Sequence, residues 1–268
     1  MAQLWLIGGT QESRQIVAAL HRQGTLPPMV VTVTRDSARR LYLTHPRLKV
    51  WVGHLGADGA DAFLQDHAIG AILDASHPFA AEISHLAIAL AQRQGLPYLR
   101  YERAPVADGT LPPDHQGRPG LVCLSDWAEL LQPQYLTPGD RTLITTGTRR
   151  LADLAPWQTR TTLFVRVLPQ PEAIAAALTA GFDPARVVAL RPPISADLEA
   201  ALWQQWRITQ VVTKASGAAG GEPHKRQLAA QLGVRLVVIT RPPVPYPRQT
   251  NDLAAAIAFA RHPHSPAT

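Results

Sequence analysis

The stretch "LWLIGGTQESRQIVAAL", Leu4 to Leu20, decides how the rest of the chain is interpreted, because it joins an apolar run to a glycine turn and a helical pattern. The run LWLI is long enough for a short buried strand. After the turn, Ile16 and Val17 recur with the later leucine at helical spacing, and Gly24 follows as a C-terminal stop signal. We therefore predict a strand, a tight turn and a helix, which together form the first βα unit of a parallel sheet.

The same alternation of apolar run and helical segment continues along the chain. In "PFAAEISHLAIALAQRQG", for example, Pro78 stands at an early helical position and Gly95 closes the helix. The predicted strands of the first half are residues 3–7, 29–34, 48–52, 70–74 and 97–101. Those of the second half are residues 121–124, 141–145, 161–167, 186–190, 208–213 and 234–239. Strands that alternate with helices in this way predict the α/β class with parallel sheets.

We predict two Rossmann-like parallel-sheet domains that face each other across a cleft, since the length of 268 residues suits about two domains. The N-terminal dinucleotide-binding domain is assigned to residues 1–104. Residues 105–120, where prolines and glycines interrupt any period, are assigned to a linker or loop. Residues 121–262 are assigned to a C-terminal α/β domain that closes the substrate cleft, and residues 263–268 to a frayed tail.

Composition restricts the class of protein. The apolar fraction of 46% and charged fraction of 17% are those of a folded globular chain. Cys123 is the one cysteine, which excludes an intramolecular disulfide and a cysteine-rich zinc site and favours a reducing compartment, where we expect it as a small buried residue. No run approaches the ~20 apolar residues of a membrane span, so we expect a cytoplasmic protein without membrane contact. His262 and His264 lie in the tail, and no metal site is predicted.

The formal net charge of +6, from 26 basic and 20 acidic residues, raises the question of an anionic partner. The basic residues are scattered and form only short pairs, and no basic strand carries interleaved aromatic residues, so nucleic acid is not predicted as a partner. A polyanionic small molecule fits the scatter better. A surface charge that is unrelated to any partner explains the scattered basic residues equally well.

The turn after the first strand is the first candidate site. Gly8 and Gly9 let the backbone approach a pyrophosphate, which would lie at the positive end of the following helix. Relative to the pattern G-x-G-x-x-G, Thr10 replaces the second glycine and Ser13 the third. A tight βα turn without any ligand tolerates glycine just as well, so this motif alone leaves both interpretations open.

The second strand, in "MVVTVTRDSARR", ends where a dinucleotide's ribose would be recognised. Asp36 would hold a 2′-hydroxyl and favours NAD. Arg35, Ser37, Arg39 and Arg40 would form a pocket for a 2′-phosphate and favour NADP, because guanidinium groups pair with phosphate oxygens. The balance favours NADPH, with NADH possible. The alternative is a solvated helix start on which Ser37 or Asp36 is the N-cap.

The fourth strand is followed by "ILDASHPFAAEIS", which places Asp74, Ser76 and His77 at the carboxyl edge of the sheet, where open α/β sheets bind ligands. A histidine before Pro78 lies on a fixed turn and is suited to proton transfer. The alternative is that Ser76 or Asp74 caps the next helix and that the imidazole only packs against its neighbours.

The second half of the chain has two loops of the same kind. Each follows a predicted strand and carries hydroxyl, glycine and basic residues. The first loop contributes Thr146, Gly147, Thr148 and Arg149, and the second contributes Lys214, Ser216 and Gly217. The second loop is not a phosphate-binding P-loop, because its lysine precedes the glycines instead of following them.

Three stretches together resemble the precorrin-6A reductase family of cobalamin biosynthesis: "LIGGTQES" at residues 6–13, "DASHPFAAEIS" with "GLPYLRYER" at 74–84 and 95–103, and "VTKASGAAGGEPHKRQLAAQLGV" at 212–234. The resemblance also includes "LITTGTRRLADL" and "RPPISADLEAAL", so it spans nearly the whole chain. The family pattern usually reads G-P-F where this chain has Pro192, Pro193 and Ile194, and T-K-N-S-G where it has Ala215 after Lys214.

The resemblance implies an oxidoreductase that uses a reduced nicotinamide cofactor to saturate one double bond of a tetrapyrrole-derived macrocycle. The implied substrate carries many carboxylates, which gives the positive charge of the chain a physical reason. The resemblance places the cofactor pyrophosphate at Gly8, Gly9, Thr10 and Ser13, and its ribose and nicotinamide near Ser76, His77 and Pro78. It places Lys214, Ser216 and Gly217 on the far side of the cleft.

Under this resemblance, hydride passes directly to a ring carbon, while water or a side chain protonates the neighbouring carbon. His77 and Lys214 are the two side chains named as proton donors. The protein itself supplies mainly orientation and electrostatics.

Other classes of protein stay open at this point. A non-catalytic nucleotide-binding module, or another NAD(P)H reductase, would show the same sheets. A short-chain oxidoreductase is disfavoured because no tyrosine stands four residues before a lysine. A nucleic-acid-binding protein ranks last. The sequence leaves open whether the substrate contains cobalt, and it leaves the oligomeric state unknown.

Overall fold

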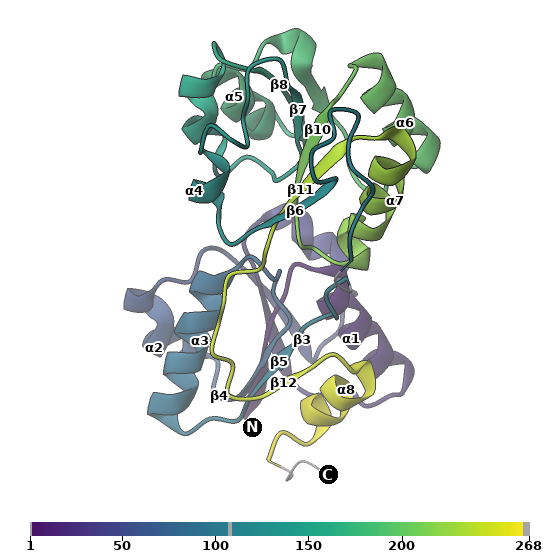
Figure 1. Cartoon of the computed structure of the whole chain (residues 1–268). Coiled ribbons are helices and arrows are strands. Elements are labelled where there is room, and N and C mark those ends of the chain that lie inside the picture. Colours follow the sequence, from purple (N-terminus) through teal and green to yellow (C-terminus); the bar gives the residue numbers. More distant parts are fainter. Residues whose placement is uncertain (1, 107–108, 265–268) are drawn as a thin grey trace. The chain divides into compact units, whose positions relative to one another are not determined.

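The computed structural model describes residues 2–106 and 109–264, and the chain divides into two compact units (Figure 1). Unit 1 comprises Met1–Ala104 and Pro242–Thr268, and unit 2 comprises Pro105–Arg241. Residues 107–108 of the predicted linker and 265–268 of the predicted tail lie outside the described residues.

Unit 1 contains a six-stranded parallel sheet in the order β3-β2-β1-β4-β5-β12. Its strands are β1 Gln3–Ile7, β2 Met29–Val33, β3 Leu48–Val52, β4 Ile69–Asp74, β5 Tyr98–Tyr101 and β12 Gln249–Thr250. Its helices are α1 Gln11–Arg22, α2 Ala57–Asp66, α3 Ala81–Gln94 and α8 Leu253–Arg261, with the 3₁₀ helix η1 at Asp36–Leu41. From β1 the chain runs outward through β2 and β3 and then returns to β4, so the strand order reverses between β1 and β4.

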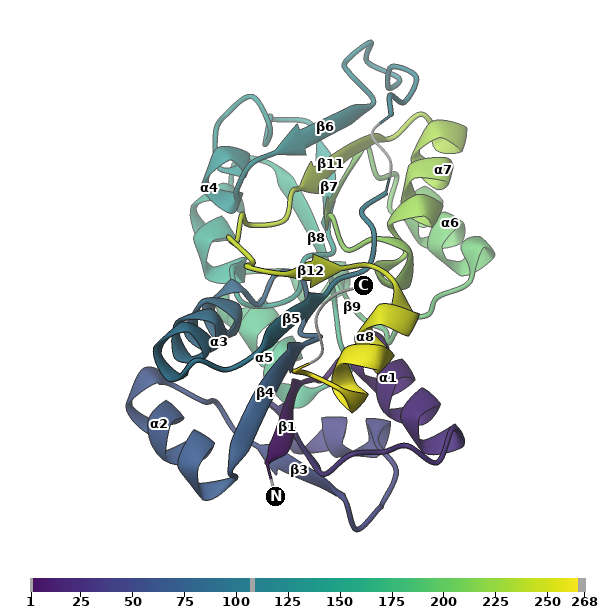
Figure 2. The ribbon, with the colours of Figure 1, turned by 90° about the horizontal axis from the view of Figure 1, so that it is seen from below.

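Both faces of this sheet are covered, as Figure 2 shows. α1 and α8 lie on one face, where Ile16, Val17 and Phe259 join side chains of the strands in one apolar core. α2 and α3 lie on the other face, where Trp5 contacts Phe63 with ring centroids 5.1 Å apart. A parallel sheet buried on both faces explains why the strands read as continuous apolar runs in the sequence.

Unit 2 contains a second six-stranded parallel sheet, in the order β6-β11-β10-β7-β8-β9. Its strands are β6 Leu121–Leu124, β7 Arg141–Ile144, β8 Thr162–Val167, β9 Val187–Ala189, β10 Gln210–Lys214 and β11 Arg235–Ile239. Its helices are α4 Trp127–Leu130, α5 Pro171–Thr179, α6 Ala196–Gln205 and α7 Glu222–Leu232, with the 3₁₀ turns η2 Leu151–Trp157, η3 Pro184–Arg186 and η4 Ala218–Gly220. α4 and α5 lie on one side of the sheet, and α6 and α7 on the other (Figure 1).

The prediction of two parallel α/β sheets is confirmed, and each predicted strand is present within about two residues of its expected bounds. The two-residue strand β12 was not predicted, because so short a segment carries no period. That the two domains face each other across a cleft stays a prediction. Among the described residues, no helix combines the length and the apolar character needed to cross a membrane.

The predicted extent of the second domain, residues 121–262, needs correction. The chain returns to unit 1 at Pro242, where β12 pairs with β5 and α8 packs on α1. The apolar pattern of α8 fits either sheet, so position along the chain was a poor guide to its partner. Residues 109–120 of the predicted linker belong to unit 2.

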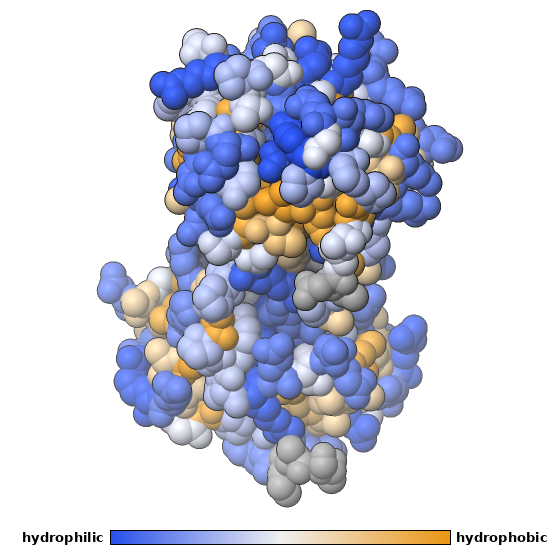
Figure 3. Space-filling model, in the orientation of Figure 1, coloured by the Kyte–Doolittle hydropathy of each residue, from blue (hydrophilic) through white to orange (hydrophobic). Residues whose placement is uncertain are grey.

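Cys123 is exposed, so the expectation of a buried cysteine is wrong. It lies on β6, which pairs with β11 at the edge of the sheet. Leu121 and Val122 of the same strand are partly exposed, and Figure 3 shows an apolar patch over this strand on a face that is otherwise mainly hydrophilic.

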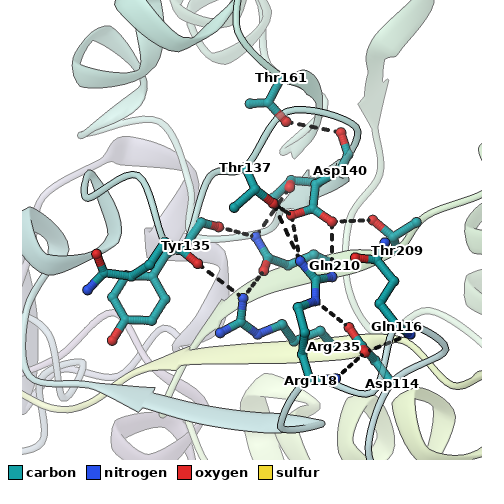
Figure 4. Close-up of polar contacts among 12 residues, drawn as sticks. Asp114, Gln116, Arg118, Tyr135, Thr137, Asp140, Thr161, Thr209, Gln210 and Arg235 are labelled. Carbon is teal, nitrogen blue, oxygen red and sulfur yellow. Dashed lines mark hydrogen bonds and ion pairs between the residues drawn. The ribbon is translucent and has the colours of Figure 1, made fainter.

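A buried polar network joins the amino ends of the central strands of unit 2 (Figure 4). The Arg118 guanidinium donates to both carboxylate oxygens of Asp140, at 2.9 and 3.0 Å, and to Asp114 at 2.7 Å. Asp140 precedes β7 and also accepts from Thr209, which precedes β10, at 3.0 Å. The network therefore ties the segment before β6 to the strands at the centre of the sheet.

These contacts outweigh the cost of burying the carboxylates. Burial by itself raises the pKa of Asp140, whose residue is 1% exposed, but hydrogen bonds from Arg118, Thr137 and Thr209 hold that pKa below its usual value. The same balance lowers the pKa of Asp114. Breaking such a pair leaves a buried charge without compensation, which costs more than the pair contributes.

We expect Asp140→Asn to lower the free energy of unfolding of unit 2 by about 3 kcal/mol at pH 7, because the arginine loses its bidentate partner. Urea denaturation followed by tryptophan fluorescence measures this, since unit 2 contains Trp127, Trp157, Trp203 and Trp206. The control for breaking an exposed ion pair is Asp61→Asn in unit 1, which breaks a 2.6 Å pair with Arg93 and should cost less than about 1 kcal/mol, without any effect on unit 2.

Asp140→Asn also tests how the stability of unit 2 depends on pH. A carboxyl with a lowered folded pKa stabilises the fold fully above its unfolded pKa of about 3.9, and this contribution is lost as the pH falls through the folded value. The parent should therefore lose stability below about pH 4 more steeply than Asp140→Asn. Equal slopes for the two proteins would contradict the proposed role of the carboxylate.

Candidate functional site

The strand order of unit 1 reverses between β1 and β4, and an open parallel sheet binds ligands beyond the carboxyl ends of the strands at such a point. Gly8, Gly9 and Thr10 follow β1, and Ser76 and His77 follow β4. The Thr10 hydroxyl donates to the carbonyl oxygen of Ala75 at 2.7 Å, so the two loops are joined directly. The structure thus brings together the predicted pyrophosphate residues and the predicted nicotinamide residues.

The glycine turn has the conformation that a close approach to a ligand requires. Gly9 has φ +86°, in the left-handed region that favours glycine. Thr10 is the N-cap of α1: its hydroxyl accepts from the Ser13 N–H at 3.1 Å, while the Ser13 hydroxyl accepts from the Thr10 N–H at 3.2 Å. This reciprocal capping box fixes the start of the helix at the turn.

A tyrosine that sequence reasoning missed lies on this turn. The Tyr42 hydroxyl accepts from the Gly9 N–H at 2.7 Å and lies 2.7 Å from the Ser13 hydroxyl. A Cβ at Gly8 would collide with the same hydroxyl and would lie 2.6 Å from Cγ1 of Val31. Nothing local in the sequence marks Tyr42, since it is 33 residues away from Gly9.

The turn fits the pyrophosphate of a nicotinamide dinucleotide. It follows the first strand of a sheet that reverses at this strand, it carries a glycine in the left-handed region, and it opens a helix of 12 residues whose N-terminus favours negative charge. Gly8, Gly9 and Thr10 are the residues that would approach this group. Ser13, predicted with them, is 0% exposed, and its hydroxyl is used in the capping box.

An acidic side chain in the first turn of α1 is neutralised. Glu12, 8% exposed, is paired with Arg103, which follows β5. Burial alone would raise the pKa of Glu12, but the hydrogen bond and charge of Arg103 lower it. The pair keeps a formal negative charge from acting alone beside the predicted pyrophosphate site.

The segment after β2 lies at the carboxyl edge, next to the glycine turn in the sheet. Arg39 donates to Asp36 at 2.7 Å and to the carbonyl oxygen of Val50 at 3.1 Å. Arg35 and Ser37 are exposed on the same segment. The capping alternative is wrong, because Arg35 is the N-cap of η1 and no side chain caps it. Their contact with a ribose or a 2′-phosphate stays a prediction.

A fully buried ion pair supports the loop after β4. Asp74 accepts from Arg100 at 2.8 Å, from the Ser76 N–H at 3.0 Å and from the Tyr98 hydroxyl at 2.9 Å. Both charged side chains are 0% exposed. Arg100 also donates to the Ser76 hydroxyl at 2.9 Å, so one ion pair fixes both the backbone and the side chain of Ser76.

His77 lies on this loop with an exposed side chain, and its Nδ1 accepts from the Phe79 N–H at 3.2 Å. The prediction that Pro78 lies in an early helical position is wrong, since α3 begins at Ala81. The alternative that Ser76 or Asp74 caps α3 is also wrong, because Ala80 is the N-cap. Both polar side chains are used within the loop instead.

Unit 2 repeats this arrangement by itself. Its strand order reverses between β7 and β10, and the two predicted loops follow these two strands. The loop after β7 carries Thr146, Gly147 with φ +84° and Arg149, and the loop after β10 carries Ser216 and Gly217. The N–H and hydroxyl of Thr145 both donate to the carbonyl oxygen of Val212 at 2.9 Å, which holds the two strand ends together.

Lys214 is the last residue of β10 and is partly buried. Burial lowers the pKa of Lys214 from its usual value, and the positive charge of Arg149 lowers it further. Two cationic side chains thus converge at the carboxyl edge of this sheet, where they could receive an anionic ligand.

The backbone groups of the glycine loop after β10 are hydrogen-bonded to side chains of α7. The Gly217 N–H donates to Glu222, which is 1% exposed, at 3.0 Å, and Arg226 holds the other carboxylate oxygen at 2.9 Å. Lys225, 2% exposed, donates to the carbonyl oxygen of Gly220 at 3.3 Å. Because a carboxylate already holds this N–H, the loop is not arranged to receive a phosphate.

The candidate residues therefore form two groups, one at the strand reversal of each unit. Across residues 2–106 and 109–264, no group of three or more histidine, cysteine, aspartate or glutamate residues could hold a metal ion. His262 lies just after α8.

The chain is similar to proteins of known function over nearly its whole length. The model of the precorrin-6x reductase CbiJ/CobK family matches residues 3–261. Cobalt-precorrin-6A reductase of Synechocystis sp. is 43% identical over 263 residues, which cover 97% of both chains. Precorrin-6A reductase of Rhodococcus erythropolis is 33% identical over 271 residues, again 97% of both chains. The solved structure of a CobK precorrin-6A reductase matches with a TM-score of 0.77 at 25% identity, covering 100% of both chains.

We expect Gly8→Ala to lower the free energy of unfolding by about 1 to 3 kcal/mol, because the new methyl group has no space beside Val31 and Tyr42. Urea denaturation measures the change. The control is Gly59→Ala in α2, where nothing lies within 4 Å of the new methyl group, and it should stabilise the protein by about 0.5 to 1 kcal/mol. An unchanged stability of Gly8→Ala would show that the turn is looser than described.

Proposed function

The chain belongs to the precorrin-6x reductase family of cobalamin biosynthesis, and we propose that it reduces one double bond of the precorrin-6A macrocycle, or of its cobalt-containing counterpart, with a nicotinamide dinucleotide as the hydride donor. The observation that carries the proposal is the glycine turn at the strand reversal of unit 1, within a family match that covers residues 3–261. NADPH is the proposed cofactor, with NADH as the alternative.

In this proposal the residues of unit 1 bind and orient the cofactor. Gly8, Gly9, Thr10 and Ser13 hold the pyrophosphate, and Arg35, Ser37 and Arg39 hold the 2′-phosphate. Ser76, His77 and Pro78 lie beside the ribose and nicotinamide. The Asp74–Arg100 pair supports this assignment, because it fixes Ser76 without a mobile side chain.

When bound, the reduced nicotinamide supplies the hydride, which adds two electrons and one hydrogen to an electrophilic ring carbon. The neighbouring carbon takes a proton, so the double bond becomes a single bond and the cofactor leaves oxidised. Lys214 and His77 are the side chains proposed to hold that proton. The lowered pKa of Lys214 supports its role, because an ammonium that loses its proton more readily is a stronger acid.

In the proposal, the loops of unit 2 receive the carboxylates of the substrate. Thr146, Gly147, Arg149, Ser216 and Gly217 are the proposed contacts. Two cationic side chains at one sheet edge, in a chain of net charge +6, would attract a polyanion. A cytoplasmic location is part of the same proposal.

A non-catalytic nucleotide-binding module is the rival proposal. It predicts binding of NADPH but no loss of nicotinamide absorbance when a precorrin-6A substrate is added. Consumption of NADPH in proportion to substrate would exclude it.

The cofactor preference can be tested through Arg39. We expect Arg39→Ala to weaken NADPH binding by about 10- to 100-fold and to leave NADH binding unchanged, because only NADPH carries the 2′-phosphate that a charged donor would hold. Fluorescence titration of the purified protein measures both affinities. The control is Arg93→Ala, since Arg93 is also paired with an aspartate at 2.6 Å but lies in the last turn of α3. Equal weakening of NADPH and NADH binding would show that Arg39 does not contact the 2′-phosphate.

The proton donor can be tested by the pH dependence of the reduction. If Lys214 gives the proton, the rate falls as the pH rises through its pKa, which lies below the usual lysine value. Lys214→Ala should abolish this pH dependence and lower the rate by about 10²- to 10⁴-fold. His77→Ala should lower the rate by about 10²-fold or less and keep the pH dependence. A variant of Lys214 with the pH profile of the parent would exclude the lysine as donor.

A further inference from the structure

Tyr42 lies on the glycine turn without any role in the reaction described so far. Its side chain is partly buried, and its hydroxyl lies 2.7 Å from both the Gly9 nitrogen and the Ser13 hydroxyl. Gly8 lies directly beneath it, where even a methyl group would collide with the hydroxyl. The turn and the tyrosine are therefore fitted to each other.

The tyrosine hydroxyl joins the turn to the start of the helix. It accepts from the Gly9 N–H, and either hydroxyl can donate in its 2.7 Å contact with Ser13. The Ser13 hydroxyl also lies 2.8 Å from the carbonyl oxygen of Thr10. Burial raises the pKa of Tyr42, although the hydrogen bonds with Ser13 and Gly9 oppose this, so the hydroxyl is neutral at pH 7. A chain of hydrogen bonds thus joins Gly9, Tyr42, Ser13 and the backbone of Thr10.

The tyrosine oxygen holds an N–H of the turn that is proposed to bind the pyrophosphate. The Gly9 N–H belongs to the turn at the strand reversal, and an N–H has one proton to share. Ser13, whose hydroxyl is hydrogen-bonded to the tyrosine, is also among the residues proposed to contact the pyrophosphate. The hydroxyl and a phosphate oxygen would therefore compete for the same partners.

We propose that Tyr42 is a gate for the cofactor pyrophosphate, which takes the Gly9 N–H by displacing the tyrosine hydroxyl. The inference rests on the proposed function, because it requires a dinucleotide at this turn. A neutral hydroxyl is suited to the role, since a phosphate makes a charge-assisted hydrogen bond that is roughly twice as strong. Because the cofactor must displace the tyrosine hydroxyl, its net binding free energy is less favourable than it would be without that hydroxyl.

The segment that carries Tyr42 also links the gate to the predicted 2′-phosphate pocket. Tyr42 follows η1 directly, and its N–H donates to the carbonyl oxygen of Arg39 at 3.0 Å. Tyr42 and Arg39 thus lie on one short segment. In the proposal, this segment carries residues for both anionic parts of the cofactor.

The test is Tyr42→Phe, which keeps the ring and removes the hydroxyl. We expect NADPH and NADH to bind about three- to tenfold more tightly, because the competing hydrogen bond is lost and its net worth is that of one neutral bond. Isothermal titration calorimetry measures both affinities. The two nucleotides should gain equally, since they share the pyrophosphate, which separates this effect from that of Arg39→Ala.

The control is Tyr135→Phe in unit 2, whose hydroxyl is 3.4 Å from Glu129 and which should leave both affinities unchanged. Tyr42→Leu is the second variant, because it frees the same N–H and should also tighten binding. Thermal unfolding of each variant is measured in parallel, since a purely structural tyrosine would lower the melting temperature without tightening binding.

The outcomes separate the two proposals. If the parent binds the nucleotides and neither Tyr42 variant binds more tightly, the gate is wrong and the proposed function stands. Weaker binding by Tyr42→Phe would show that the hydroxyl holds the cofactor instead of competing with it, and would also overturn the gate. If neither the parent nor the variants bind NADPH or NADH, both proposals fail.

Discussion

Parallel strands cannot be joined by tight turns, so each connection carries the chain across one face of the sheet. A sheet that is covered on both faces must therefore reverse its strand order at one point, and the connections diverge there. In this chain the reversals lie between β1 and β4 in unit 1 and between β7 and β10 in unit 2. The loops after all four strands carry candidate residues, and Arg35, Ser37 and Arg39 follow the neighbouring strand β2. The topology thus gathers the candidate residues of each unit at the carboxyl edge of its sheet.

Two buried ionic networks lie at opposite edges of their sheets, and this difference gives them different uses. Arg118 and Asp140 lie at the amino edge of unit 2, away from the candidate loops, and connect segments that are distant along the chain. Asp74 and Arg100 lie at the carboxyl edge of unit 1 and fix Ser76. A buried ion pair adds little to stability compared with an apolar core. The second pair is therefore best understood as support for a loop that has to be rigid.

The sequence predicted what is encoded locally. Apolar runs gave all strands except β12, and the glycine and histidine loops lie at the strand reversals. Contacts between distant segments could not be predicted in this way. α8 packs in unit 1 although it follows unit 2 in the chain. This could not be predicted, because its apolar face does not indicate which sheet it packs against. Tyr42 has no local motif, and its importance appears only where the fold brings it to Gly9. The roles of His77 and Lys214 stay predictions, because position at a sheet edge does not determine which group transfers a proton.

Two of the glycine turns described above differ in the partners of their N–H groups. In unit 2 the Gly217 N–H is held by the carboxylate of Glu222, which Arg226 holds in turn. A charged acceptor makes a strong hydrogen bond, so this N–H already has a partner that a phosphate does not readily displace. In unit 1 the Gly9 N–H is held by the neutral hydroxyl of Tyr42. A neutral hydroxyl is a weaker acceptor than a charged group. Of the two turns, the proposal therefore assigns the exchange of partner for a pyrophosphate to the first.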